Sequence, residues 1–386
     1  MIAEHLFPMR LLQAGRAVVT AVVTIVLGGC AQSVVPLAQT KPIRGMPPLL
    51  TWVSEFTRPA GTSYPTLTDN SRFGSISGLV RDPQTNQWVG VIDDRDTRIA
   101  WLSVDVSSGR LVVSPTKMTR LTAGPGVDEA VATRADLEAI TALADGTFLM
   151  SEEGHLTKDG IWQPALLHVT REGLVTDVFT FPEPFLLRRD QSRGLRDNRG
   201  FEGLTRTPDG RLIAALEQPL IEDGPVTSFD RGATGRLVEL APRRGGFSIR
   251  RQWSYPIEKT PRIDGYPGVC DDGENGVSEL LALTNTLLLS MERACLEDPQ
   301  SRQVTNAVQI FAVELGRELR KTLVLDLSML TERVLSSEMR RLDNFEGMAF
   351  GPTALNGTRT LLLVSDDNFR ATQRTSFLLF GLRIMQ

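Results

Sequence analysis

The pattern of hydrophobic and polar residues repeats five times along the chain. Each repeat has a short apolar run headed by a polar residue, then a turn, then a second apolar run whose end carries acidic residues. The repeats cover residues 75–95, 136–154, 200–218, 276–293 and 344–369. Two of the turns are Ala-Asp-Gly and Pro-Asp-Gly, and Asp-Gly between short apolar runs is a hairpin signal. Each repeat is therefore predicted to form an antiparallel hairpin.

Further alternating stretches lie between the repeats. Residues 165–182, 235–256 and 308–327 each read as a strand, a turn and a strand. Together with the hairpins they give four strands per repeat, which is the unit of a β-propeller. The chain is therefore predicted to be all-β, with one propeller of five four-stranded blades. A sixth, irregular blade in a long connection such as 219–254 and a two-sheet sandwich are the alternatives.

The two ends of the predicted propeller indicate how it closes. After the fifth repeat, residues 375–384 supply one more strand, which leaves the last blade without its outer strand. Residues 49–57, "LLTWVSEFT", are an unassigned strand candidate near the N-terminus. Pairing this strand into the last blade would close the ring and cover a sheet edge.

Acidic residues recur at both ends of each hairpin. The innermost strands of a propeller surround a central channel, and an antiparallel arrangement brings the head of the first strand close to the tail of the second. The predicted heads are Ser77, Glu138, Glu202, Glu279 and Glu346, and the predicted tails include Asp93, Glu152, Glu217, Glu292, Asp366 and Asp367. These acids are expected to gather at one channel mouth, where cations, arginines or backbone N–H groups must offset their repulsion.

Carboxylates gathered in this way suit a hard cation, because Ca²⁺ takes several oxygen ligands in flexible geometry. The candidate calcium ligands are Asp93, Glu138, Glu152, Glu202, Glu279, Glu346, Asp366 and Asp367. Glu202 and Glu217 are candidate catalytic carboxylates that orient water. Arg95, Arg199 and Arg293 adjoin these acids and are candidates for holding phosphate oxygens. The alternative is that the repeated glutamate is a fold signature that binds the backbone of the neighbouring blade.

Serine and zinc chemistry have less support in the sequence. No G-x-S-x-G motif occurs, and the chain has three histidines. His155 follows two glutamates in a predicted loop and is the candidate catalytic base, with Ser77 as a nucleophile on chain position alone. Few histidines and cysteines argue against zinc.

Composition excludes one class of partner. The formal net charge of −4 over 386 residues gives no reason to expect nucleic acid. The basic stretch at residues 188–199 is interspersed with aspartates and is typical of a solvated loop. We expect a monomer.

The N-terminus predicts export. Basic residues precede an apolar run at 17–27, which is too short to span a bilayer and has the features of a signal peptide. The run ends in "LGGC", which resembles a bacterial lipobox with Cys30 as the lipidated residue. The predicted parts are a signal peptide at 1–29, a lipid-anchored linker at 30–48 and the propeller at 49–386. Ala31 favours a periplasm-facing outer-membrane lipoprotein, and a plain cleaved signal is the alternative.

Lipidation of Cys30 would leave two of the three cysteines. Cys270 and Cys295 flank a predicted hairpin whose open end brings them together, and an exported protein meets an oxidising compartment. A disulfide between them is predicted, with two free thiols as the alternative.

Several motifs together resemble a known family. "FGSISGL", "DLEAITALADGTFLMSEEG", "RGFEGLTRTPDGRLIAALE" and "DNFEGMAFGP" with "LLLVSDDNF" resemble the bacterial family described as esterase-like activity of phytase. The resemblance covers residues 51–384 and implies a propeller related to calcium-dependent phytases, with esterase or phosphoesterase activity. It supplies no agreed set of catalytic residues.

The expected function is calcium-assisted hydrolysis of phosphoric or carboxylic esters of small molecules. The alternative is a non-catalytic binding platform or scaffold at the cell envelope, because fold does not imply function. The loops at 183–200, 218–235 and 258–276 would then form its contact face.

Overall fold

The computed structural model describes residues 47–64, 67, 72–94, 96–243, 246–330, 335–336 and 341–384. The chain divides into two compact units, Met1–Pro42 and Ile43–Gln386, and every described residue belongs to the second. The predicted signal peptide, Cys30, the linker up to residue 46, and Arg95 lie outside the described residues. No helix in the described part is long and apolar enough to cross a membrane.

Five sheets follow one another along the chain, and each forms a blade. Blade 1 contains β2 (Ile76–Arg81), β3 (Trp88–Ile92), β4 (Arg98–Asp105) and β5 (Val112–Arg120). Blade 2 contains β7 (Leu137–Ala142), β8 (Phe148–Glu152), β11 (Ala165–Val169) and β12 (Leu174–Thr180), with β6 (Thr122–Ala123) parallel to β12. Blade 3 contains β13 (Phe201–Arg206), β14 (Leu212–Leu216), β15 (Ala233–Arg243) and β16 (Gly246–Ile257).

The last two blades complete the propeller. Blade 4 contains β18 (Gly276–Ala282), β19 (Leu287–Asp298), β20 (Gln303–Leu315) and β21 (Leu319–Asp326), with β17 (Gly268–Val269) paired to β19. Blade 5 contains β22 (Asn344–Phe350), β23 (Thr360–Asp366), β24 (Arg374–Arg383) and β1 (Leu49–Pro59). Outside the blades lie β9 (His155–Leu156), β10 (Ile161–Trp162), α1 (Glu129–Arg134), η1 (Ile221–Asp223) and η2 (Leu327–Met329).

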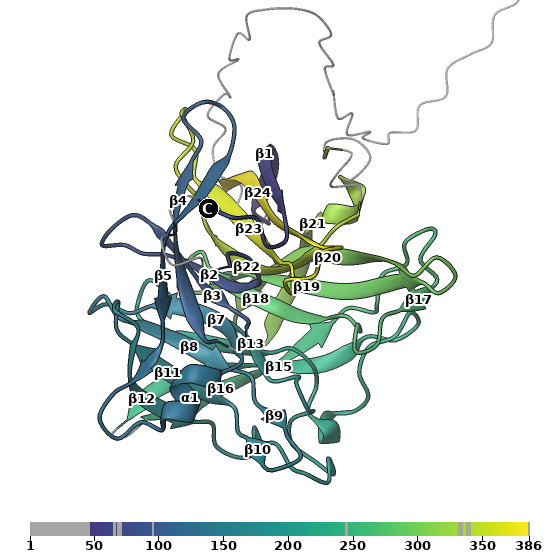
Figure 1. Cartoon of the computed structure of the whole chain (residues 1–386). Coiled ribbons are helices and arrows are strands. Elements are labelled where there is room, and N and C mark those ends of the chain that lie inside the picture. The colour runs from purple at the N-terminus through teal and green to yellow at the C-terminus, as the bar shows by residue number, and fades with distance from the viewer. Residues whose placement is uncertain are drawn as a thin grey trace, which may run out of the picture. The chain divides into compact units, whose positions relative to one another are not determined.

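The ring closes through the N-terminal strand, as the sequence predicts. β1 pairs antiparallel with β24, and the two strands lie side by side although they come from opposite ends of the chain (Figure 1). The innermost strands contact one another in a cycle, from β2 to β7, β13, β18, β22 and back to β2. The described residues therefore form five blades, which excludes both the sixth blade and the sandwich.

The hydrophobic core lies between neighbouring blades. One cluster joins Val91 and Ile99 of blade 1 to Ile140 and Met150 of blade 2. All five residues of β3, β8 and β14 are buried. Because each of these strands is covered by a neighbouring blade on both faces, its apolar run is continuous rather than alternating.

The predicted disulfide is present between Cys270 and Cys295. Cys270 follows β17, and Cys295 lies within β19 rather than in a loop. The backbone N–H of Cys270 also donates to the Cys295 carbonyl at 3.1 Å. The bond fixes the start of the segment 270–274, which borders the channel mouth described below.

Candidate functional site

Every innermost strand carries a β-bulge at the same place. The register shifts lie between residues 76 and 78, 137 and 139, 201 and 203, 277 and 279, and 345 and 347. A bulge leaves one residue unpaired and re-aims its side chain. The unpaired residues are Ser77, Glu138, Glu202, Ser278 and Glu346, and we call them the head positions.

The matching residues at the end of each second strand are called the tail positions. Each is the residue whose backbone pairs with the residue two positions before the head of the same blade. Asp93 N–H donates to the Ser75 carbonyl, Glu153 N–H to Asp136, and Glu217 N–H to Gly200. In blades 4 and 5 the corresponding pairs are Gly276 with Arg293 and Asn344 with Asp366. The tail positions are therefore Asp93, Glu153, Glu217, Arg293 and Asp366, so blade 4 supplies an arginine where the other blades supply an acid.

This register corrects the predicted place of Glu279. Ser278 holds the head position of blade 4, and Glu279 stands where blades 1, 3 and 5 have glycine. A Cβ added to Gly203 would lie 2.8 Å from the Leu280 side chain of the next blade, so this position faces a close neighbour. Glu279 instead accepts hydrogen bonds from Leu280 N–H at 2.8 Å and Leu204 N–H at 3.4 Å. It binds neighbouring backbone, which is the alternative role that the sequence left open.

Three predicted tail acids also face away from the channel. Glu152 precedes the tail position and accepts hydrogen bonds from Asp136 N–H at 2.5 Å and Gly154 N–H at 3.2 Å. Glu292 likewise precedes the tail position of its blade, Arg293, by one residue. The side-chain period of a strand is two, so a slip of one residue turns a side chain to the opposite face.

Glu292 and Asp367 have structural partners instead. Glu292 accepts hydrogen bonds from the Tyr255 hydroxyl at 2.8 Å and Asn275 Nδ2 at 2.7 Å, and it pairs with Lys321. Asp367 accepts hydrogen bonds from Ser75 N–H at 2.9 Å, Phe369 N–H at 3.0 Å and the Thr375 hydroxyl at 2.6 Å. Both carboxylates are fully buried.

A cavity of about 290 Å³ lies at the channel mouth. It is lined by three of the head residues and four of the tail residues, together with loop residues and Arg370, while Ser77, Ser278 and Glu217 are not in its lining. The predicted site residues that line it are Asp93, Glu138, Glu202, Glu346, Asp366, Arg199 and Arg293. Loop residues Asp197, Asn198 and Asp272 complete its rim. The convergence of acids from separate blades is thus present, with the changes of register given above.

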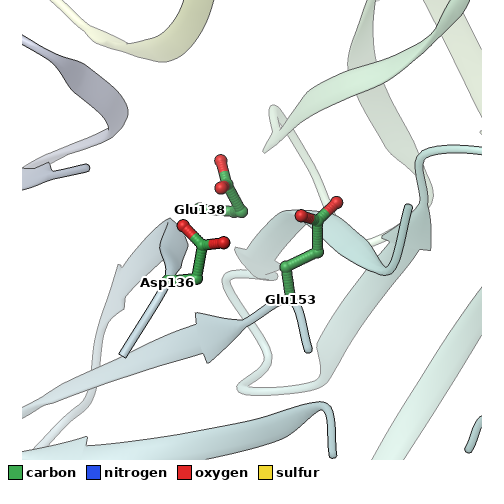
Figure 2. A group of neighbouring side chains, drawn as sticks. All are labelled: Asp136, Glu138 and Glu153. Carbon is green, nitrogen blue, oxygen red and sulfur yellow. The ribbon is translucent and has the colours of Figure 1, made fainter. Parts of the chain in front are cut away.

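Two groups of carboxylates in and behind this lining have the spacing of a metal site, and two of their members, Asp136 and Glu217, do not line the cavity itself. Asp136, Glu138 and Glu153 form one group, and Glu153, Glu202 and Glu217 form the other. Within each group, one carboxylate oxygen from every residue lies within 4.8 Å of the others. The side chains of the first group project into one common space (Figure 2). Glu153 belongs to both groups and therefore links them.

The second group also contains unsatisfied oxygens. Glu202 is 6% exposed and Glu217 is 1% exposed, and Oε2 of each has no hydrogen-bond partner among the described residues. A buried polar atom without a partner costs free energy. The oxygen donors and these two free acceptors fit a hard cation, since neither group contains a histidine or a cysteine.

Two arginines partly balance the acids. Arg199 Nη1 lies 2.7 Å from Glu217 Oε1, and its Nη2 donates to the Asp272 carbonyl. Arg293 Nη2 lies 2.9 Å from Glu346 Oε1, while its buried Nε has no hydrogen-bond partner within the described part of the chain. Both guanidiniums line the cavity and are nearly buried.

Burial, together with the remaining repulsion, shifts the acids toward their protonated forms. Burial, together with the nearby charge of Asp136, raises the pKa of Asp93 to about 7. Burial and Asp93 raise the pKa of Asp366 to about 7, and burial and Glu217 raise the pKa of Glu202 to about 8. The pKa values of Glu138, Glu153 and Glu346 are also raised by burial and neighbouring charges.

These raised pKa values predict a pH-dependent stability. A carboxyl group whose pKa is higher in the folded chain stabilises the fold while protonated, and this contribution is lost as the pH rises through the folded-state pKa. In the presence of a chelator, the free energy of unfolding should fall from about pH 4.5 to about pH 8. Urea denaturation across this range measures it. Asp366→Asn should flatten the profile, and a stability that rises over this range in EDTA would contradict the prediction.

His155 lies beside a different cavity. It lines a space of about 470 Å³ with Asp93, Asp94 and Asp136, and its Nδ1 is 4.0 Å from Asp136 Oδ2. Its ring stacks on Trp162. Neither His155 Nδ1 nor the buried Ser77 hydroxyl has a hydrogen-bond partner among the described residues. The predicted pairing of Ser77 with His155 is therefore not formed.

The sequence reasoning missed two members of the metal groups, Asp136 and Glu153. Asp136 stands two residues before the head Glu138 in "DLE", and Glu153 is the second acid of the tail pair. Side chains two residues apart in a strand share a face, so counting back two residues from Glu138 would have placed Asp136 beside it. Aligning the repeats on the extra residue of the bulge would have selected Glu153 rather than Glu152 as the tail residue.

A family model described as "Phytase-like: Esterase-like activity of phytase" matches residues 71–369, and no curated protein matches. One similar solved structure is the endo-arabinase from Bacteroides thetaiotaomicron VPI-5482, at 10% identity and a TM-score of 0.46, covering 85% of this chain and 98% of that one. Another is the Bombyx mori GH32 beta-fructofuranosidase BmSUC1, at 10% identity and a TM-score of 0.37, covering 86% and 62%. At these scores the structural similarities carry no argument about function.

Proposed function

The chain belongs to the family described as esterase-like activity of phytase, and from this we propose that it is a calcium-assisted hydrolase of phosphoric or carboxylic esters. The proposed active site is the acidic channel mouth. The observation that carries it is the pair of carboxylate groups joined through Glu153, with two buried oxygens that lack a hydrogen-bond partner among the described residues.

The proposed calcium ligands come from the two groups. Asp136, Glu138, Glu153, Glu202 and Glu217 would hold the ion, because these are the carboxylates that the fold gathers within reach of one another. Bound Ca²⁺ would supply positive charge that attracts the ester and stabilises the charge that develops during hydrolysis.

The protein's own residues bind and orient the reactants. Arg199 and Arg293 donate to the anionic oxygens of the ester, since guanidinium groups form strong charge-assisted hydrogen bonds. The free Nε of Arg293 is one such donor. Glu202 and Glu217 accept hydrogen bonds from the attacking water and so orient it. His155 is proposed as a positioning residue that acts through Asp136, at 4.0 Å, rather than as a base for serine.

An assay on two esters tests this proposal. The full chain is incubated with p-nitrophenyl phosphate and p-nitrophenyl acetate, once with Ca²⁺ and once with EDTA. Release of p-nitrophenol that requires Ca²⁺ supports the proposal, and the preferred ester tells the phosphoric from the carboxylic class. No hydrolysis of either ester, or equal hydrolysis with and without EDTA, would overturn it.

The second candidate function is a binding platform at the cell envelope. It is favoured by the loop residues Asp197, Asn198 and Asp272, which border the cavity from two of the long connections. A chain that takes up Ca²⁺ in calorimetry, hydrolyses neither ester and still binds a small anion would support this candidate over the first.

A further inference from the structure

The end of the propeller opposite the channel mouth forms a face of its own. In an antiparallel blade, the turn between the first two strands and the turn between the last two strands lie at the same end. The head and tail positions lie at the other end. We call the first end the turn face, and it consists of the loops at 82–87, 106–111, 143–147, 170–173, 207–211, 283–286, 316–318 and 351–359, together with the strand ends at Arg243 and Arg383.

The N-terminal part of the chain joins the propeller at this turn face. Leu49, the first residue of β1, pairs with Arg383, the last residue of β24. The neighbouring Leu382 N–H donates to the carbonyl of Arg359, in the loop before β23, at 2.7 Å. The segment that precedes β1 therefore connects to the side of the propeller opposite the channel mouth.

The predicted lipid on Cys30 would hold the propeller beside a membrane without choosing which face meets it. Residues 31–48 separate Cys30 from β1, and a chain of this length reaches at most about 60 Å when it is extended. Such a tether gives the propeller a high effective concentration at the bilayer. It is also long enough for any face to turn toward the lipid, so the side chains on each face decide which one docks.

Many of the acids on the turn face are neutralised by arginines. The ion pairs there join Asp82 to Arg171, Asp209 and Glu239 to Arg211, and Glu314 to Arg320. The acids of this face that form no ion pair with a described residue are Asp105, Asp145, Glu172 and Glu318. Asp145 and Glu172 both belong to blade 2, so the turn ends of the other blades carry few free acids.

Unpaired arginines outnumber these acids. Arg110, Arg243, Arg317 and Arg359 are exposed and come from blades 1, 3, 4 and 5, and Arg81, Arg206 and Arg383 are half-buried at the same face. None of them forms an ion pair with a described residue. The whole chain has a formal net charge of −4, so a positive turn face leaves the rest of the molecule negative. An anionic surface would therefore attract this face and repel the acidic mouth.

An exposed apolar side chain stands on the same face. Leu355 is 77% exposed in the loop at 351–359, and Leu49 at the start of β1 and Val112 at the start of β5 are also exposed. Blades 5 and 1, which supply these residues, are neighbours in the ring. Apolar side chains beside basic ones are typical of proteins that lie on the interface of a membrane.

We propose that the turn face docks on an anionic membrane surface, so that the channel mouth opens away from the bilayer. Lipid phosphates accept hydrogen bonds from the exposed arginines, and Leu355 enters the headgroup layer. The mouth then takes its ligands from the aqueous side. This inference goes beyond the proposed function and needs neither bound calcium nor hydrolysis.

Vesicle flotation tests the docking with the unit Ile43–Gln386, which contains all five blades and the closing strand β1. This unit lacks the apolar run at 17–27, so any binding belongs to the propeller. Phosphatidylcholine vesicles are compared with vesicles that also contain phosphatidylglycerol, both in EDTA so that Ca²⁺ does not bridge acids to lipid. The anionic vesicles should bind at least about tenfold more tightly, and raising NaCl from about 0.05 M to about 0.5 M should abolish the difference.

Variants without the charge place the contact on the turn face. Arg317→Gln and Arg359→Gln should each weaken binding to the anionic vesicles about fivefold. Arg193→Gln is the matched control, because Arg193 is an exposed arginine in the loop between β12 and β13, at the mouth end, and it should bind as the wild type does. Thermal melting checks that each variant is folded, and Arg110→Gln replaces either one that is not.

A quencher carried by the lipid tests the orientation. Leu355→Cys accepts a single fluorescent label, because the two native cysteines of the unit are bonded to each other. Brominated lipid in the anionic vesicles should quench this label and leave the same label on Arg193→Cys bright. Equal binding to both kinds of vesicle, wild-type binding by both arginine variants, or quenching at Arg193→Cys as strong as at Leu355→Cys would overturn the proposal.

Discussion

Replacing Glu153 with glutamine is expected to weaken calcium binding by about 100-fold or more and to abolish the calcium-dependent hydrolysis. Even residues that only support metal ligands change affinity by about 10- to 100-fold, and Glu153 is a member of both carboxylate groups. The amide keeps an oxygen for the hydrogen bond that Glu153 Oε1 now accepts from Gly200 N–H at 3.0 Å. The loss should therefore reflect the missing charge and not a disrupted loop.

Isothermal calorimetry with Ca²⁺ and the two ester assays measure this effect. Glu279→Gln is the matched control, because Glu279 is an equally buried glutamate of an innermost strand that binds backbone N–H groups. It should bind Ca²⁺ as the wild type does. In EDTA, Glu153→Gln should be more stable than the wild type at a pH high enough to ionise Glu153, since the amide carries no charge to repel the neighbouring acids. Wild-type calcium affinity in Glu153→Gln, or a matching loss in Glu279→Gln, would show that the site is placed wrongly.

The fold could be predicted from the sequence because its signal is local and repeated. Five hairpins with Asp-Gly turns or their equivalents, each followed by two more strands, leave few arrangements other than a propeller. The closing strand at 49–57 was predictable for the same reason, since the last blade lacked one strand. The pairing of Cys270 with Cys295 followed from the hairpin between them.

The site could be predicted only to within one residue. The bulge in each innermost strand adds a residue without any change in the apolar pattern, so alignment by eye matched Glu279 with Glu202 when Ser278 is the equivalent. The same uncertainty led to the prediction of Glu152 as the tail residue of blade 2, where the structure has Glu153. Neighbouring residues of a strand point to opposite faces of the sheet. An alignment error of one residue therefore leaves the predicted fold unchanged but replaces a residue that faces the channel with one that is buried for structural reasons.

The uneven distribution of charge around the channel mouth was the feature of the site that the sequence predicted least well. Arg293 stands beside Glu292, and sequence reasoning took the acid as the repeated element and the arginine as its neighbour. In the structure the arginine holds the tail position, and the acid is buried with Lys321 and Tyr255. The mouth therefore combines acids from blades 1, 2, 3 and 5 with three guanidiniums in its lining, those of Arg199, Arg293 and Arg370, which is an arrangement suited to holding a cation and an anion together.

This asymmetry leads to opposite expectations for calcium affinity and for hydrolysis in Arg293→Met. Glu346 is buried, and it would lose a guanidinium partner at 2.9 Å. Breaking a buried ion pair costs about 3–5 kcal/mol, so the variant in EDTA should be less stable by an amount of this order. Calcium should recover part of the loss, because removing a positive charge strengthens the attraction of the mouth for a cation. Urea denaturation with and without Ca²⁺ measures both effects.

Hydrolysis should fall in the same variant although its calcium affinity rises. If Arg293 holds the anionic part of the ester, kcat/KM for p-nitrophenyl phosphate should fall roughly 10- to 100-fold in the calcium-loaded variant, which is the value of a hydrogen bond to a charged group. Arg236→Met is the control, because it breaks the ion pair between Arg236 of β15 and Asp223 of η1 and leaves the lining of the mouth intact. The control should lose stability and keep its kcat/KM. Equal activity in the two variants would mean that Arg293 only neutralises Glu346, and the ester would then have to be held from Arg199 and Arg370 alone.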